Sequence, residues 1–327
     1  MNVLEAVKTG DVDRLLYLLQ QGVNAQYQRG RTALMEACIH DRIDAAHILL
    51  QHGANTGIHV RDDRGESAMT LACWGGDLPL VRLLQEHGAS IYDRDPAGAT
   101  TMSRAIRKHE PRLVRHIIES VEEDVENKGK TRQEAMDFIN SQDEDGETAL
   151  STACLCQRFG IVPYLLDHGA SEGINLHSHE YLQTALHLVS MAGDVDTVRL
   201  LLEAGADPTL VDVRGMTARD MAAESGYQAV VDVLDEYEKW YTMKRLRILP
   251  QLDADPDLYN KFRPRLPPAD PVNAGHDVDG LPLAPLRYEF QPGLDPKKQA
   301  LVDEILSRRL KYDPMVMLEK LSKVSGV

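Results

Sequence analysis

The sequence contains few aromatic residues and cysteines, and it has no long apolar run. Of its 327 residues, 5% are aromatic and four are cysteine, whereas 43% are hydrophobic and 27% are charged. Because no run of about 20 apolar residues occurs, we expect no membrane-spanning helix. The motifs GxxxxGK(S/T), GxGxxG, HExxH and GxSxG, which mark phosphate-binding, dinucleotide-binding, zinc-protease and serine-hydrolase sites, are absent. We therefore expect no enzymatic activity and no cofactor.

The positions of the four cysteines favour buried thiols over disulfides or a zinc site. Cys38, Cys73 and Cys154 occupy one equivalent position in a repeated block, and Cys156 lies two residues further on, so no CxxC pair exists. Unpaired cysteines are typical of a reducing compartment, and a cytoplasmic location is expected. The short segment HSHE (177–180) is interpreted as a solvated loop, and no metal site is expected.

Charge is distributed unevenly along the chain. The net charge is −15, but residues 241–327 contain 14 basic and 12 acidic side chains. The first 240 residues therefore carry a net charge of −17. Such a surface repels a phosphate backbone, so nucleic acid is not an expected partner. A membrane partner and a small-molecule substrate are likewise not expected.

A block of the form Gly-x-Thr/Ser followed by two apolar helical patterns recurs along these 240 residues. Clear copies are RGRTALMEACIHDRIDAAHILLQHGAN (29–55), RGESAMTLACWGGDLPLVRLLQEHGAS (64–90) and DGETALSTACLCQRFGIVPYLLDHGAS (145–171). The turn glycines Gly30, Gly65 and Gly98 are 35 and 33 residues apart. A fixed period of this size predicts a stack of identical helical units that bury their apolar faces against one another.

Helix-capping residues accompany each block. A hydroxyl residue that can accept from the free amides of a first helical turn lies two positions after each turn: Thr32, Ser67, Thr100, Thr148, Thr184 and Thr217. A glycine suited to a left-handed C-terminal cap follows four of the second apolar runs: Gly53, Gly88, Gly169 and Gly205. The preceding His52, His87 and His168 are expected to contact the last helical carbonyls.

The block resembles the ankyrin repeat, whose period is 33 residues and whose signature is T-P-L-H-x-A. The segment YLQTALHLVSMAGDVDTVRLLLEAGADPT (181–209) is the most similar copy and keeps His187 in the histidine position. The resemblance implies an all-α ankyrin-repeat solenoid, with helix pairs joined by β-turn or hairpin loops, over residues 1–240. We expect seven units, near 1–26, 27–61, 62–94, 95–142, 143–178, 179–211 and 212–240.

Two parts of the sequence depart from this pattern. The fourth unit is about 15 residues longer than the repeat period, because of the charged stretch 121–140, which we interpret as an extended outer helix and a loop. In the sixth unit Leu182 replaces the turn glycine. Beyond the repeats, 241–296 is expected to be a Pro-rich extended segment, and 297–327 to hold two short helices.

The resemblance also implies where a partner would bind. In ankyrin stacks a concave groove is formed by the loop tips beside each turn and by the last exposed residues of each inner helix. Carried over to this chain, the protein-binding candidates are Trp74, Arg31, Arg64, Glu66, His40, Arg104, Arg107, Lys108, Leu155, Tyr181 and Met191. Trp74 is the leading candidate, because tryptophan is enriched among residues that dominate binding energy. The alternative is that it packs on a neighbouring helix.

A basic cluster in the fourth unit stands out in an acidic stack: Arg104, Arg107, Lys108, Arg112 and Arg115. It is interpreted either as a solvated helix face or as a binding site for an acidic partner segment. Together these features predict a non-catalytic adaptor or scaffold that binds a polypeptide in the ankyrin groove and uses its C-terminal segment for a second contact. Two alternatives stay open, namely a structural or autoregulated protein whose tail packs on its own repeats, and a substrate-recruiting ubiquitin-ligase subunit.

Overall fold

The computed structural model describes residues 3–18 and 28–245 of the chain, and all regular elements in these ranges are helices. Four isolated antiparallel β bridges accompany the turns. The chain divides into two compact units, Met1–Leu188 and Val189–Val327. Residues 241–245, predicted to begin the Pro-rich extended segment, are helical instead, and the rest of that segment and both predicted C-terminal helices lie outside the described residues.

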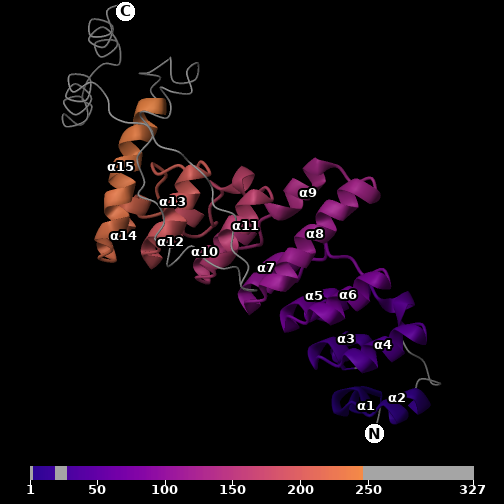
Figure 1. The fold of residues 1–327 in the computed structure, drawn as a ribbon. Coiled ribbons are helices and arrows are strands. Elements are labelled where there is room, and N and C mark those ends of the chain that lie inside the picture. The colour runs from indigo at the N-terminus through magenta and orange to yellow at the C-terminus, as the bar shows by residue number, and fades with distance from the viewer. Residues whose placement is uncertain (1–2, 19–27, 246–327) are drawn as a thin grey trace, which may run out of the picture. The chain divides into compact units, whose positions relative to one another are not determined.

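The first unit has inner and outer helices that alternate along the chain (Figure 1). The inner helices are α1 (Val3–Thr9), α3 (Ala33–Ile39), α5 (Ala68–Gly75), α7 (Thr101–Lys108) and α10 (Ala149–Leu155). Their outer partners are α2 (Val12–Leu18), α4 (Ile43–Gln51), α6 (Leu78–Glu86), α8 (Pro111–Asn127) and α11 (Val162–Asp167). Each inner helix contacts the next, from α1 through to α10. Short 3₁₀ turns lie at Gln28–Gly30, Ala54–Gly57, Phe159–Ile161 and Ala170–Gly173. This stack confirms the predicted solenoid of helix pairs.

In the second unit the outer helices pack against each other. Helix α12 (Ala185–Ala192) crosses the boundary between the units, and α13 (Val195–Glu203), α14 (Ala218–Glu224) and α15 (Gln228–Arg245) follow it. Helix α15 contacts both α13 and α14. The buried Tyr237 hydroxyl donates to the carbonyl of Leu202 at 2.6 Å, which ties α15 to the end of α13.

Small and apolar side chains fill the core, as the pattern predicts. The alanines of the inner helices are completely buried (Ala37, Ala72, Ala105 and Ala153), which allows neighbouring helices to approach closely. Cys38, Cys73 and Cys154 are buried, Cys156 is partly exposed, and all four thiols are free. The buried-thiol interpretation is therefore confirmed for Cys38, Cys73 and Cys154 but not for Cys156.

The predicted helix caps are present at most positions. The side chains of Thr32, Ser67, Thr100, Thr148 and Thr217 each accept a hydrogen bond from the backbone amide three residues later. The glycines Gly53, Gly88, Gly169 and Gly205 adopt the left-handed conformation, with φ of 96° to 102°. Leu182 also has a positive φ, of 54°, in the place of a turn glycine. Of the histidines, His87 does contact a carbonyl, that of Leu83 at 2.9 Å. For His168 the prediction was wrong, because its Nδ1 lies 2.6 Å from Glu122 of α8.

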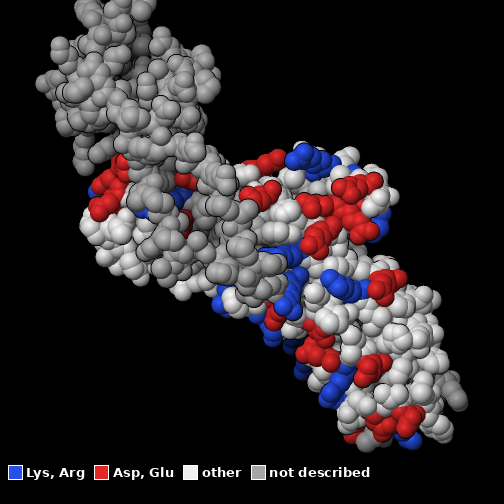
Figure 2. All heavy atoms as spheres, viewed as in Figure 1, with Lys and Arg blue, Asp and Glu red and all other residues white. Residues whose placement is uncertain are grey.

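The inserted stretch 121–140 forms more structure than expected. It lengthens α8 to 17 residues, as predicted, but a further helix, α9 (Arg132–Ile139), replaces the expected loop. Long-range contacts explain this difference. The Tyr92 hydroxyl donates to Asp124 at 2.9 Å, and the Tyr92 ring packs edge-on against Phe138 of α9 at 4.9 Å. Acidic side chains gather over α8 and α9 on the face drawn in Figure 2.

An aspartate three residues before the turn glycine organises four of the turns: Asp62, Asp95, Asp143 and Asp212. In each, Oδ1 accepts from the backbone amides two and four residues later, at 2.8–3.1 Å. The other oxygen receives an arginine side chain, respectively Arg31, Arg104, Arg107 and Arg214. Sequence reasoning missed this feature, although the regular spacing of the aspartates could have revealed it.

A row of polar side chains links successive turns of the first unit. Arg61, Arg94 and Gln142 each donate to the carbonyl of their own turn glycine and to a carbonyl of the next repeat, at 2.7–3.1 Å. The last of these bonds reaches the carbonyl of His177. These bonds tie each turn to the next along the stack.

Candidate functional site

The candidate site consists of one side chain at the end of each of the inner helices α3, α5, α7 and α10, and three of the four are exposed whereas Ile39 is half-buried. Nine residues after the turn glycine, the first unit presents Ile39, Trp74, Arg107 and Leu155, from α3, α5, α7 and α10 in turn. We call these four residues the inner-helix row. Trp74 is 57% exposed and Leu155 is 50% exposed, whereas large apolar side chains on the buried faces of the same helices are almost inaccessible. The row lies at the positions that the resemblance predicted.

Trp74 rests on a fixed cation. The guanidinium carbon of Arg104 on α7 lies 4.9 Å from the centre of the Trp74 ring system. Arg104 in turn makes ion pairs with Glu66 at 2.7 Å and with Asp95 at 2.5 Å, and its side chain is only 11% exposed. One face of the indole is therefore supported by a buried network, and more than half of the side chain stays accessible.

The predicted basic cluster is divided between two helices. Arg104, Arg107 and Lys108 belong to α7, whereas Arg112 and Arg115 belong to the outer helix α8. Arg115 lies over the ring of Tyr164, at 5.3 Å from its centre. Of the α7 residues, Arg104 is committed to its ion pairs, which leaves Arg107 and Lys108 as the exposed cations at the row.

The side chain of Arg107 is held in place by a buried carboxylate, that of Asp143. Its Nη2 donates to Oδ2 of Asp143 at 3.1 Å, and that carboxylate is almost completely buried. Lys108 lies close to the end of α5, because its Cγ would be 2.9 Å from a Cβ placed on Gly76, the residue that caps this helix; the Cγ of Glu110 would be 2.7 Å from the same position. Arg104 and Lys108 are four residues apart, so they lie on the same face of α7.

A second group of basic side chains lies at the N-terminal end of the row. The buried carboxylate of Glu36 on α3 is approached by Lys8 at 3.6 Å, Arg31 at 3.3 Å and His40 at 3.5 Å. Arg31 also pairs with Asp62 at 3.3 Å. The sequence-predicted candidates Arg31 and His40 are thus brought together by one acid, with the Lys8 and His40 side chains facing solvent.

The predicted loop-tip residues differ in their surroundings. Glu66 makes an ion pair with Arg104 and accepts a hydrogen bond from the Thr70 hydroxyl, each at 2.7 Å. It therefore helps to hold the arginine on which Trp74 packs. Arg64 and Tyr181 are exposed, Tyr181 to 52%. Glu147 occupies the position of Glu66 in the fifth repeat, but one of its carboxylate oxygens is buried without a hydrogen-bond partner. Burial is the main reason why the pKa of Glu147 is raised.

In the second unit the equivalent positions are Met191 on α12 and Glu224 on α14. Met191 is 45% exposed, as predicted for a binding residue. Glu224 contacts Arg214 at 3.3 Å. The nearby Val211 and Val213 are also exposed apolar side chains.

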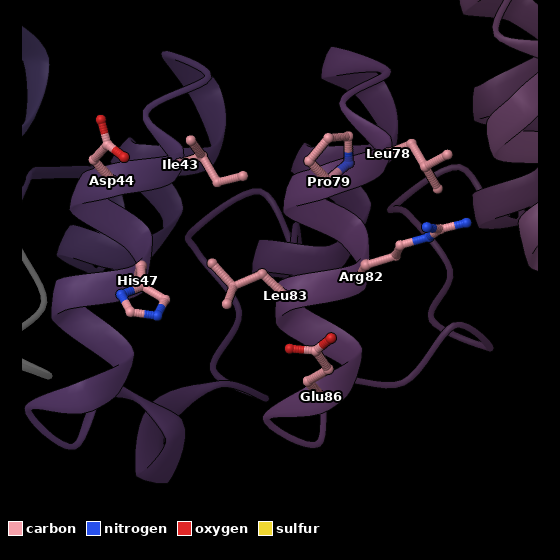
Figure 3. Close-up of a pocket in the computed structure, with 8 residues that line it drawn as sticks. All are labelled: Ile43, Asp44, His47, Leu78, Pro79, Arg82, Leu83 and Glu86. Carbon is pink, nitrogen blue, oxygen red and sulfur yellow. The ribbon is translucent and has the colours of Figure 1, made fainter.

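A pocket of about 600 Å³ lies between the outer helices α4 and α6 of the first unit. Figure 3 shows Ile43, Asp44 and His47 on one side, and Leu78, Pro79, Arg82, Leu83 and Glu86 on the other. None of these residues belongs to the inner-helix row.

Within the described ranges, no group of three or more His, Cys, Asp or Glu side chains could hold a metal ion. His177 and His179 instead contact backbone carbonyls, those of Ser178 and Glu144. Burial raises the pKa of the Cys73 thiol to about 12 and also raises that of Cys38, which leaves these thiols unreactive. No helix in residues 3–18 or 28–245 combines the length and apolar character that crossing a bilayer requires.

Comparisons with known proteins agree with the geometry of the repeats. A family model described as "Ankyrin repeats (3 copies)" matches residues 3–95 and 172–242, and one described as "Ankyrin repeat" matches residues 145–174. These ranges include α1 to α6, α10 to α14 and most of α15.

Among curated proteins, human BCL-6 corepressor-like protein 1 is 32% identical over 127 residues. The match covers 39% of this chain and only 6% of that protein. Among solved structures, the ankyrin repeat domain of human ASB11 has a TM-score of 0.56 at 25% identity, covering 71% of this chain and 96% of that one. The ankyrin repeat domain of Bcl-3, an IkappaB family member, gives the same TM-score and identity over 72% and 98%.

Proposed function

Because this chain belongs to the ankyrin repeat family, whose repeats mediate protein–protein interactions, we propose that it is a non-catalytic adaptor that binds a partner polypeptide along the inner-helix row. The exposed and pre-positioned indole of Trp74 is the observation that carries this proposal. A tryptophan that is 57% exposed leaves a large apolar area in water, and a partner would recover that free energy by covering it.

The support from Arg104 strengthens this argument. Ordering a side chain on binding costs about 0.5–1.5 kcal/mol, and a ring already held in one orientation avoids much of that cost. Trp, Tyr and Arg are the residues most often found to dominate interfaces. Leu155 and Arg107, further along the row, would extend the contact on one side of Trp74, and Ile39 would extend it on the other.

The adaptor role also requires a second contact. We assign it to the C-terminal segment 246–327, which lies outside the described residues. Support comes from its sequence, since its charge is close to balanced and it contains apolar residues such as Leu281, Leu283 and Phe290, unlike a simple polar linker. The four free cysteines fit a reducing compartment, and we propose that the protein acts in the cytoplasm.

Affinity purification with the full chain tests the proposal, using the Trp74→Ala variant and a matched control. Tyr17 on α2 is 63% exposed and has Arg14 at 5.4 Å from its ring, so it resembles Trp74 but lies on an outer helix. We expect Trp74→Ala to lose its partners and Tyr17→Ala to keep them. Retention of every partner by Trp74→Ala would contradict the proposal.

A further inference from the structure

The inner-helix row has a distinctive order of side-chain chemistry. From α3 to α10 its residues are apolar, apolar, cationic and apolar, namely Ile39, Trp74, Arg107 and Leu155. The cation thus lies between two strongly exposed apolar side chains, each on a directly neighbouring helix, since α7 contacts both α5 and α10. A ligand that crosses these helices meets the three side chains in sequence.

Two exposed cations, Arg107 and Lys108, lie at the row although the chain as a whole carries a net charge of −15. The carboxylates that pair with its cations are buried, because the side chains of Asp143 and Glu36 are only 3% and 6% exposed. The side chain of Arg107 is 38% exposed, and Lys108 is exposed as well. Two acids also lie near this region, Asp41 next to Gly75 and Glu110 next to Gly76. Arg107 has five donors and uses one of them on Asp143, so others can bind an incoming carboxylate.

The distance between the helices restricts the form of the ligand. Packed helices lie about 8–10 Å apart, and an extended peptide advances about 3.3 Å per residue. About three residues of extended chain therefore span the distance from one inner helix to the next, whereas a helical ligand, which rises about 1.5 Å per residue, would need about five to seven.

We propose that the inner-helix row binds an extended peptide in which an acidic residue contacts Arg107 and Lys108, while apolar residues about three positions to either side contact Trp74 and Leu155. This inference rests on the proposed function and specifies the partner's chemistry. The apolar residue at Trp74 supplies most of the affinity, and the acidic residue fixes the register of the peptide, because charge complementarity governs specificity more than affinity.

The test is a selection from a displayed library of random 12-residue peptides, performed on the full chain and counter-selected on the Trp74→Ala variant. We expect the recovered peptides to carry Asp or Glu flanked by apolar residues at the predicted spacing. Trp74-dependent peptides without an acidic residue at that spacing would overturn the inference and leave the proposed function standing. Recovery of no Trp74-dependent peptide would overturn both.

A second experiment exchanges the charges of Lys108 and of the peptide's acidic residue. Fluorescence anisotropy measures the affinity of one selected peptide for each variant. Lys108→Glu should weaken binding by about tenfold, and a peptide with Lys in place of its acidic residue should bind this variant better than it binds the parent protein. Arg82→Glu, on the outer helix α6, makes the same change in net charge and should alter affinity by less than about twofold. Equal losses in the two variants, or no rescue by the exchanged peptide, would contradict a specific contact at Lys108.

Discussion

The ring system of Trp74 and the guanidinium group of Arg104 lie 4.9 Å apart, on successive inner helices. Arg104 contributes to stability as well as to the proposed binding site, because it also neutralises two largely buried carboxylates, Glu66 and Asp95. A residue needed for folding thus sets the position of the residue proposed to bind the partner.

Replacing Arg104 with methionine should destabilise the protein by about 3 kcal/mol, since removing one member of a buried ion-pair network leaves the others uncompensated. Urea denaturation measures the loss. Arg64→Met, at an exposed loop tip, serves as the control and should change stability by less than about 0.5 kcal/mol. Similar effects in both variants would show that the Arg104 network contributes little.

Glu147→Gln should stabilise the protein at neutral and alkaline pH. Burial raises the pKa of Glu147, so the folded state holds its proton more tightly than the unfolded chain does. The stability that this proton contributes is fully present below the pKa of Glu147 in the unfolded chain, and it is lost as pH rises through the folded-state pKa. Glutamine keeps the neutral form at every pH. The difference in unfolding free energy should therefore be small near pH 4 and grow towards pH 8. A difference that is constant across this range would contradict the assignment.

Two turn glycines form a matched pair for testing how the repeats pack. Gly146 and Gly215 both have positive φ, of 80° and 76°, so alanine should cost about 1 kcal/mol in either. At Gly146 a Cβ would also lie 2.7 Å from the backbone nitrogen of His179, whereas nothing lies within 4 Å at Gly215. We expect Gly146→Ala to cost about 1–3 kcal/mol more than Gly215→Ala in thermal unfolding. Equal costs would argue against tight packing of the turns.

Gln157→Gly should stabilise the protein by roughly 0.5–1 kcal/mol. Gln157 is exposed and follows α10 with a φ of 56°, at the position where other repeats have a glycine, such as Gly76 or Gly193. Gln157→Ala retains the unfavourable left-handed conformation and should not stabilise. An unchanged midpoint in the glycine variant would mean that the local backbone relaxes to avoid the strain.

The sequence predicted those features that depend on local spacing. The caps at Thr32 and Thr148 and the exposure of Trp74 and Leu155 follow from helix periodicity and from the repeat register. Because equivalent sequence positions have equivalent surroundings in every repeat, the exposure of a position in one repeat predicts the exposure of that position in the others.

Features that depend on contacts between distant segments were not predicted. Helix α9 packs against Tyr92, about 40 residues earlier, and its own composition gave no sign of this contact. The support of Trp74 by Arg104, and the pairing of His168 with Glu122, likewise join different repeats. In the sequence the basic cluster looked continuous, whereas the turn between α7 and α8 separates its members onto two helices.

The most direct test of the account is the affinity of a Trp74-dependent ligand for the parent protein and for Trp74→Ala, with thermal unfolding measured in parallel. We predict a loss on the order of 2 kcal/mol in binding, about 30-fold in Kd, with a nearly unchanged unfolding midpoint, because the indole is mostly in solvent. A change in affinity below about twofold, with the fold intact, would contradict the claim that partner binding depends on the inner-helix row.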